Sequence, residues 1–305
     1  MDFLFRSVDI ASLVFYRIAF GVLAAADALG IFIYYHLYSD HFNPHKFQFG
    51  YYGFEWVTVF PEPLMSLFFL LLISAAVCIG FGRFYRVATV VFFLGFTYAF
   101  LLEKAHYLNH GYFFCWLSFV MIFLPAHREA SGDVLANPSL RRERIPFWCI
   151  ALPAFLMGVV YFFGGIAKLN ADWLSAVPLG RWIAYKKDLP LVGPVLALPI
   201  TGYFMAYAGA FLDLFVVPLL LWKRTRLLAV LMLLFFHLTN TVIFQIGIFP
   251  WLSLAMTVLY FPPHLPRKWW RWMRSHTRFG RWIDRRYQRH WTRSVAAGDG
   301  NAVIN

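Results

Sequence analysis

Charged residues are scarce in this 305-residue chain: Asp, Glu, Lys and Arg make up 14% of it, whereas 61% of the residues are hydrophobic. A soluble domain carries about 25% charged residues, so the chain has too little ionisable surface for a soluble fold. This shortage excludes most soluble enzymes. The length alone would fit about two soluble domains. The composition indicates instead an all-α, polytopic transmembrane helical bundle, which can have the same length.

Cysteines and the familiar motifs of soluble chemistry are also rare or missing. The three cysteines lie inside apolar runs, at Cys78, Cys115 and Cys149. They imply no disulfide or zinc framework. The chain has no phosphate-binding Walker loop, no dinucleotide fingerprint, no HExxH zinc motif and no GxSxG nucleophile motif. Enzymes that depend on these motifs are therefore excluded.

A metal site is not expected either. His41 and His45 are four residues apart, a spacing that would place them on one face of a helix. Pro44 lies between them and argues against such a helix, because proline disrupts the hydrogen bonding of a helix interior. We therefore predict that the chain holds no metal ion.

Long apolar runs dominate the sequence instead. A membrane-crossing helix needs about 20 mostly apolar residues, and about eight stretches approach that length. They do not alternate in polarity with a period of two, which favours helices over the strands of a barrel. The first run is too long for the core of a signal peptide, so we expect it to be retained. The predicted spans are residues 11–31, 64–82, 86–103, 110–126, 147–167, 195–222, 226–245 and 248–262.

Basic residues are distributed unevenly around these runs, in a chain whose formal net charge is +12. If the N-terminus is cytoplasmic, most of the 27 Lys and Arg residues fall in segments on the cytoplasmic side. The positive-inside rule therefore predicts an integral membrane protein with both termini in the cytoplasm. The two long outer loops, residues 32–63 and 168–194, are predicted to be functional or re-entrant.

The C-terminal end differs in character from the rest. We divide the chain into a transmembrane domain, residues 1–266, and a basic tail, residues 267–305. The tail mixes many cations with five tryptophans, which are Trp269, Trp270, Trp272, Trp282 and Trp291. Such a segment directly after a span is typical of an amphipathic helix that lies on the membrane surface. We expect the lipid bilayer and anionic lipids as its partners, and no nucleic acid.

Ionisable residues inside the predicted spans are few. Because they are costly in a bilayer, each one begins as a functional hypothesis. Arg17 and Asp27 are ten residues apart, about 15 Å along a helix, so they do not pair with each other. These two residues and Asp213 also fit a structural interpretation, in which buried polar contacts hold helices together. Both interpretations stay open from the sequence.

The segment GGIAKLNADW, residues 164–173, is the most unusual part of the chain. Gly164 and Gly165 allow another backbone to approach, and Lys168 follows on the same face of a helix. An amine in an apolar pocket loses hydration, so its pKa falls and it can act as a base. The alternative is a lysine that anchors a helix end at the membrane interface.

A second polar pair lies in the seventh predicted span. His237 and Asn240, in the segment FHLTN, are three residues apart and therefore share one helix face. Such a pair can orient a quinone or carbonyl oxygen. It can equally form hydrogen bonds between neighbouring helices, and the sequence leaves both possibilities open.

Five blocks of sequence are similar to one known family. They are ASLVFYRIAFGVLAAAD (11–27), FLLEKAHYLNHGY (100–112), YFFGGIAKLNADW (161–173), AFLDLF (210–215) and FHLTNTVIFQIGIF (236–249). In this order and spacing they resemble the membrane part of vitamin K-dependent gamma-glutamyl carboxylase. They also resemble its microbial relatives, the HTTM (horizontally transferred transmembrane) domain proteins. The resemblance covers most of the chain.

The resemblance implies a membrane enzyme, in the inner membrane of a bacterium, with vitamin K or menaquinone-type hydroquinone as cofactor. Lys168 matches the family lysine that deprotonates the hydroquinone, which O2 then converts to an epoxide. The strong base formed on the way removes a proton from glutamate, and CO2 adds to it. His127 matches a family histidine that assists at the glutamate of a peptide or protein substrate. The expected cofactor-binding residues are Phe163, Gly164, Gly165, His237 and Asn240.

The sequence also departs from the family. Asn170 and Ala167 replace an aspartate and a lysine beside the family base, and Ala126 replaces an asparagine before His127. The animal carboxylases continue into a large lumenal domain that has no counterpart here, so a non-catalytic module that binds quinone, lipid or a partner protein is the alternative. In the predicted topology, His127 and Lys168 are about 25 to 30 Å apart, so a shared site needs a broken or re-entrant helix.

Overall fold

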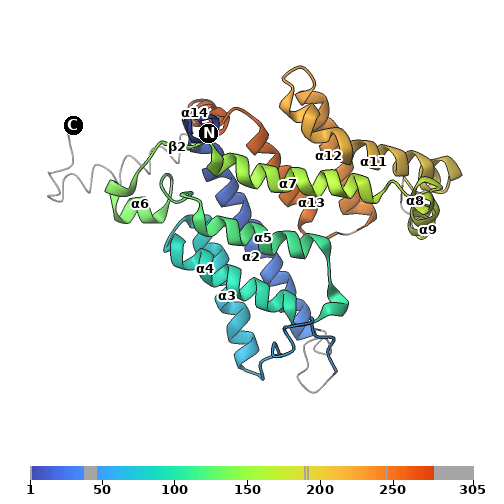
Figure 1. Cartoon of the computed structure of the whole chain (residues 1–305), viewed down its shortest axis with the longest axis horizontal. Coiled ribbons are helices and arrows are strands. Elements are labelled where there is room, and N and C mark those ends of the chain that lie inside the picture. The colour runs from blue at the N-terminus through green and yellow to red at the C-terminus, as the bar shows by residue number, and fades with distance from the viewer. Residues whose placement is uncertain (1, 38–46, 189, 191, 245, 278–305) are drawn as a thin grey trace.

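Helices account for nearly all the regular structure in the described part of the chain, which confirms the predicted all-α class (Figure 1). The computed structural model describes residues 2–37, 47–188, 190, 192–244 and 246–277. The longer helices are α2 (Ala11–Leu37), α3 (Leu64–Phe81), α4 (Tyr85–Leu101), α5 (Asn109–Phe123), α7 (Trp148–Ala167), α11 (Pro199–Leu221), α12 (Arg226–Ile243) and α14 (Leu265–His276). The shorter ones are α1 (Asp2–Phe5), α6 (Gly132–Ala136), α8 (Ala171–Leu174), α9 (Val177–Ala184), α10 (Gly193–Leu196) and α13 (Phe249–Met256). Three 3-10 turns, η1 (Lys104–His106), η2 (Pro138–Leu140) and η3 (Thr257–Tyr260), and an antiparallel pair of strands, β1 (Ser7–Asp9) and β2 (Arg144–Pro146), complete the described elements.

Five helices are long and apolar enough to cross a membrane, so the chain is an integral membrane protein. They are α2, α3, α7, α11 and α12. Helices α4 and α5 and the α13–η3 segment are apolar but shorter. Helix α5, with 15 residues, is about 23 Å long, whereas the hydrocarbon core of a bilayer is about 30 Å thick. Each of the eight predicted spans coincides with an apolar helix, but the number of spans stays a prediction.

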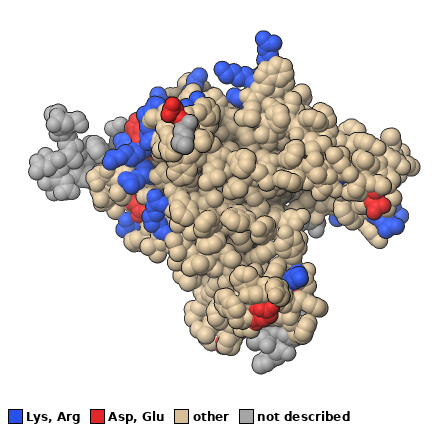
Figure 2. Space-filling model, viewed as in Figure 1, with Lys and Arg blue, Asp and Glu red and all other residues tan. Residues whose placement is uncertain are grey.

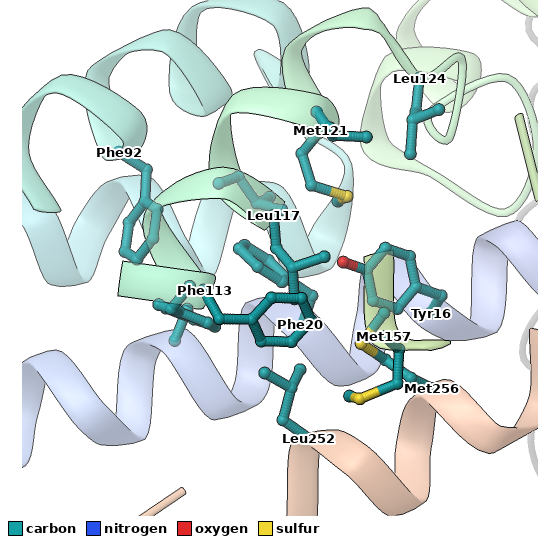
Figure 3. Close-up of a cluster of buried hydrophobic side chains, with 14 of the residues drawn as sticks. Tyr16, Phe20, Phe92, Phe113, Leu117, Met121, Leu124, Met157, Leu252 and Met256 are labelled. Carbon is teal, nitrogen blue, oxygen red and sulfur yellow. The ribbon is translucent and has the colours of Figure 1, made fainter. Parts of the chain in front are cut away.

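The hydrophobic core lies where α2, α4, α5, α7 and α13 meet. Figure 3 shows Phe20 of α2 at its centre, between Phe113 and Leu117 of α5 and Leu252 of α13. The Phe20 ring also packs against Phe92 of α4, with 5.9 Å between ring centroids. Methionines from α5, α7 and α13 fill the neighbouring space. The core therefore joins the N-terminal helices to the group formed by α7, α11 and α12.

Small residues allow two pairs of helices to approach closely. At Gly21 of α2, an added Cβ would overlap the backbone of Gly80 in α3. At Gly165 of α7, an added Cβ would lie 2.7 Å from the side chain of Leu214 in α11. Small residues at such crossings are typical of membrane helices, since tight packing replaces the hydrophobic effect as the force between them.

Helix α14 is joined to the N-terminal segment by one arginine. Arg267 forms ion pairs with Asp9, at 2.8 Å, and with Glu129, at 2.6 Å. Burial works against the charged form of Asp9, but hydrogen bonds from Arg267 and from the Ala11 backbone, together with the positive charge of Arg267, outweigh burial and keep the pKa of Asp9 below its ordinary value. The exposed tryptophans of α14 are Trp269, Trp270 and Trp272. The remaining part of the predicted tail, with Trp282 and Trp291, lies outside the described residues.

The crossing of α2 and α3 gives a first prediction. Gly21→Ala places a methyl group against the Gly80 backbone, so we expect the free energy of unfolding to fall by about 1 to 3 kcal/mol. Thermal unfolding of the protein in nanodiscs, followed by circular dichroism, measures the change. Gly30→Ala is the matched control on the same helix, because nothing lies within 4 Å of a Cβ added there. The control should gain up to about 1 kcal/mol from helix propensity. Equal stability of the two variants would contradict the close crossing.

Candidate functional site

An ion pair at the end of α7 is the centre of the site. Lys168 directly follows α7, and its Nζ pairs with the Oδ2 of Asp213 in α11. The Nζ also donates a hydrogen bond of 3.2 Å to the carbonyl oxygen of Gly164. The side chains of Lys168 and Asp213 are 20% and 7% exposed, so both charges are largely removed from solvent.

The two glycines before Lys168 have different structural roles. Gly165 allows α7 to pack against Leu214 of α11, which brings the two charged residues within reach. Gly164 faces Asp213, since a Cβ added at Gly164 would lie 3.3 Å from the carboxylate Oδ2. A larger residue at position 164 would push the carboxylate away from the lysine. The pair therefore depends on both glycines.

The turn after Lys168 is fixed by Asn170 and Trp173. The Asn170 side chain accepts a hydrogen bond from the Trp173 backbone, at 2.9 Å, and donates one to the carbonyl of Ala167, at 2.8 Å. An ionised aspartate could accept the first bond but could not donate the second. The Trp173 indole donates to the carbonyl of Ala206 in α11, at 3.0 Å, and its ring lies 5.4 Å from the Lys168 Nζ. Asn170 therefore stabilises the local turn that presents the lysine.

A cavity of about 1040 Å³ opens beside the ion pair. Side chains from α7, α9, α11 and α12 form most of its wall, and most of them are apolar or aromatic. The polar residues that line it include Lys168, Asp213, Tyr161 and Asn240. Ligand pockets in proteins typically combine such an apolar wall with a few well-placed polar groups.

A second buried polar contact lies behind the wall of the cavity. The Tyr161 hydroxyl of α7 and the Nε2 of His237 in α12 are 2.8 Å apart. His237 is completely buried, and its Nδ1 has no hydrogen-bond partner in the part of the chain that the structure describes. Tyr161 lines the cavity, whereas His237 does not. The sequence analysis did not identify Tyr161, although its position seven residues before Lys168 places it on the same face of α7.

Comparison with known families identifies the family of this chain. The model of the HTTM domain matches residues 5–265. The chain belongs to the HTTM domain family. This confirms the resemblance inferred from the five sequence blocks. No solved structure matches the HTTM chain at a significant level.

The residues that the sequence predicted for the cofactor lie in three different environments of the HTTM domain. Gly164 and Asn240 line the cavity together with Lys168. Gly165 and His237 lie behind its wall. Gly165 packs against Leu214 of α11, and His237 forms a hydrogen bond with Tyr161. The third environment is the outer surface of α7, where Phe163 is 62% exposed and does not line the cavity.

His127 lies elsewhere in the HTTM domain. It follows α5, is buried, and stacks on Tyr85 with 4.9 Å between ring centroids. The guanidinium of Arg17 holds the same loop by donating hydrogen bonds to the carbonyl oxygens of Ala126, at 2.8 Å, and Ala130, at 2.7 Å. In Figure 1, α5 ends toward α6, whereas α7 ends toward α8. The structure therefore does not bring His127 to the cavity beside Lys168, in line with the separation expected from the predicted topology.

A second cavity, of about 950 Å³, adjoins the first. Both are lined by His110 and Phe249, whose rings are 5.8 Å apart. Two carboxylates, from Asp27 and Glu103, face the second cavity, and its described lining contains no Lys or Arg. The described residues contain no group of three His, Cys, Asp or Glu side chains that could hold a metal ion. His41 and His45 lie outside the described residues.

The environment of His127 predicts a pH dependence of stability. Burial, together with the charges of Arg86 and Arg128, lowers the pKa of His127 from 6.5 to about 4. Between these two values the unfolded chain binds a proton that the folded protein does not. The contribution of His127 to the free energy of unfolding is therefore fully present above about pH 6.5. The free energy of unfolding falls by about 1 to 3 kcal/mol as the pH drops toward 4. Thermal unfolding in nanodiscs across this range measures the effect.

The control for this prediction is His127→Gln, which removes the titrating group and keeps a polar side chain. The variant should lose part of the slope between pH 6.5 and 4. An identical slope in the variant and the wild type would show that other groups cause the pH dependence.

Proposed function

We propose that this HTTM protein is a membrane enzyme whose Lys168–Asp213 pair acts as a base toward the hydroxyl group of a lipophilic hydroquinone. The observation that carries the proposal is the position of this pair, at the wall of a cavity that is otherwise mostly apolar. The hydroquinone is of the vitamin K or menaquinone type. The proposed overall reaction is epoxidation with O2, coupled to the addition of CO2 to a glutamate of a peptide or protein.

The cavity has the chemistry that such a ligand needs. Its volume, about 1040 Å³, matches the upper end of ligand pockets, which measure about 300 to 1,000 Å³. Aromatic side chains such as Trp173 and Trp182 offer faces on which a quinone ring can stack. A bound hydroquinone would supply, with O2, the oxidation that generates the strong base for the carboxylation. Lys168, Asp213 and Trp173 would hold its reacting end.

The base is best described as the pair rather than as a free amine. Asp213 lies directly against the Lys168 amine, so the two side chains face a ligand in the cavity as one unit. The pair as a unit carries no net charge and can take up one proton from a ligand hydroxyl. It then carries one positive charge beside the ligand oxygen that has lost the proton. Charge is balanced within the apolar cavity, which avoids an isolated buried ion.

The alternative is a non-catalytic module that binds a quinone, a lipid or a partner protein. Two observations favour it. The Lys168 amine is held by Asp213 and Gly164, and His127 does not reach the cavity. In addition, the second cavity is poorly suited to bind the carboxylate of a glutamate substrate. Its lining includes Asp27 and Glu103 but no Lys or Arg among the described residues. The measurement below separates the two functions.

The test of the proposed function uses purified protein in nanodiscs with vitamin K hydroquinone and O2, and follows epoxide by chromatography. We expect Lys168→Ala to lower the rate of epoxide formation at least about 100-fold, as the loss of a general base does. Lys186→Ala is the matched control, since Lys186 also lines the cavity but lies outside the ion pair. Its rate should stay within about threefold of the wild type.

Loss of folding must be separated from loss of catalysis. Removing one partner of a buried ion pair costs about 3 to 5 kcal/mol, whereas replacing both by apolar residues is close to neutral. The double variant Lys168→Met with Asp213→Leu should therefore unfold near the wild-type temperature and still form no epoxide. Full activity of a folded Lys168→Ala variant would exclude the base. Binding of the hydroquinone without epoxide from the wild type would favour the non-catalytic module.

We also propose that both termini are cytoplasmic, in the inner membrane of a bacterium. Figure 2 shows Lys and Arg gathered on the side of the molecule where Figure 1 places α6, β2 and α14. The positive-inside rule supports a cytoplasmic location for that side. On the same side, the exposed tryptophans of α14 lie among basic residues, an arrangement that suits a surface of anionic lipid.

Labelling with a membrane-impermeant thiol reagent tests this orientation. We expect Lys187→Cys to react in intact spheroplasts and Arg224→Cys to react only after permeabilisation, because the two exposed positions lie at opposite ends of α11. The unmodified protein is the control for its own three cysteines. The opposite pattern of labelling would reverse the topology.

A further inference from the structure

Asp27 of α2 differs from Arg17 and Asp213, two other ionisable residues of the long apolar helices. Arg17 donates hydrogen bonds to backbone carbonyls, and Asp213 pairs with Lys168. The carboxylate of Asp27 has no hydrogen-bond or ion-pair partner in the part of the chain that the structure describes. An ionised group inside a membrane is costly without a partner. The position of Asp27 therefore points to a partner that is not part of the chain.

Asp27 faces the second cavity, whose volume is about 950 Å³. Gly30, Ile31 and Tyr34 line the same cavity, and their spacing after Asp27 places all four residues on one face of α2. A Cβ added at Gly30 would meet nothing within 4 Å. The space beside the carboxylate is therefore open, and a ligand in the cavity can reach the oxygens of Asp27.

The charge of the cavity lining favours a cation. Glu103, which follows α4, supplies a second carboxylate, and the described lining contains no Lys or Arg. The two carboxylates are held differently. The Glu103 oxygens accept hydrogen bonds from the backbone N–H groups of Phe49, at 3.3 Å, and Ala105, at 2.8 Å. Asp27 is therefore the carboxylate that is available to a ligand.

The rest of the wall favours an organic cation over a metal ion. The faces of aromatic rings attract cations, and the rings also pack against apolar groups. Although His106 and His110 line the cavity too, the described residues contain no group of three His, Cys, Asp or Glu side chains that could hold a metal ion. The aromatic residues of the lining are Tyr34, Phe96, Phe100, Phe114, Phe244 and Phe249.

We propose that the second cavity binds an organic ammonium ion with an apolar group, which is either a free amine or the headgroup of a lipid. The ammonium N–H groups donate hydrogen bonds to the Asp27 carboxylate, and the apolar group packs on the aromatic rings. The two cavities adjoin at His110 and Phe249, but the ammonium site does not include the Lys168–Asp213 pair. Binding at this site is independent of the epoxidation proposed for the first cavity.

Equilibrium dialysis of phenethylamine against the purified protein tests the proposal. The protein is kept in dodecyl maltoside micelles, which have neither charged headgroups nor amines, and empty micelles correct for partition. Phenethyl alcohol, which has a hydroxyl group in place of the ammonium group, is the neutral comparison. At about pH 7.5 an alkylamine is charged. We expect the wild type to bind phenethylamine at least about tenfold more tightly than the alcohol, the effect of one charge-assisted hydrogen bond.

Three variants separate a specific effect of Asp27 from a general one. Asp27→Asn removes the negative charge, keeps the shape of the side chain and should reduce the ratio of the two affinities to within about twofold. Unchanged binding of the alcohol shows that the cavity of this variant is folded. Asp172→Asn is the matched control, because Asp172 is exposed on α8 and lines neither cavity, and it should keep the tenfold ratio. Gly30→Leu fills the open space beside Asp27 and should weaken the binding of both compounds.

Competition separates a lipid headgroup from a free amine. Phosphatidylethanolamine and phosphatidylglycerol with identical acyl chains are added to separate samples that contain bound phenethylamine. Displacement by phosphatidylethanolamine alone identifies a lipid headgroup as the ligand, whereas displacement by neither lipid identifies a free amine. Displacement by phosphatidylglycerol shows that an acyl chain, rather than an ammonium ion, fills the cavity, and it overturns the inference.

The binding ratios decide the inference without the epoxide assay. A tenfold ratio that persists in folded Asp27→Asn overturns it, because Asp27 is then not the counterion of the ligand. A wild type that binds the two compounds equally, or binds neither, also overturns it and leaves Asp27 as an uncharged structural group. Since Lys168 lines the first cavity and Asp27 the second, loss of epoxide in Lys168→Ala neither supports nor removes the ammonium site.

Discussion

The ion pair between Lys168 and Asp213 is the interaction on which the site depends. Two charges in an apolar environment are costly to desolvate, and a buried pair is often no more stable than apolar residues of similar size. Its presence beside a large cavity is therefore poorly explained by stability alone. The packing of α7 on α11 at Gly165 and the open space at Gly164 both serve to bring the two side chains together. The same contacts shape the wall of the cavity, so the cavity and the charge pair form one unit.

Other ionisable groups of this HTTM domain are held by contacts of a different kind. Arg17 donates its hydrogen bonds to backbone carbonyls of the loop after α5, and Arg267 is enclosed by Asp9 and Glu129. Neither residue lines one of the two cavities. These contacts hold loops and helix ends together, which agrees with the structural interpretation of Arg17. An ion pair that borders a cavity can instead exchange a proton with whatever binds there, and this separates Lys168 from the structural cations.

The sequence predicted the helices well because long apolar runs have few alternatives in a membrane protein. It also identified the segment around Lys168, since glycines followed by a lysine are conspicuous in an apolar run. It did not pair Lys168 with Asp213, because the contact joins residues 45 positions apart on two helices and no local pattern encodes it. Tyr161 was missed for a related reason: one tyrosine among phenylalanines does not reveal which side of a helix faces a cavity. The outward position of Phe163 on α7 could not be read from the sequence for the same reason.

Tyr161 lies on α7 and Lys168 directly follows its last residue, and this placement has a mechanical consequence. Residues on one helix face keep a fixed separation, whereas residues on loops or separate helices shift as the elements move. A ligand held between Tyr161 and Lys168 would therefore be positioned by a single rigid element, and His237 and Asp213 from the neighbouring helices would fix the side chains at each end. Motion of α11 or α12 against α7 would change the charge and hydrogen bonding at Lys168 and Tyr161 more than the distance between these two residues. Such a site can tolerate movement between helices while it keeps the orientation of the ligand, and this matters for a proton transfer that depends on close and correct geometry.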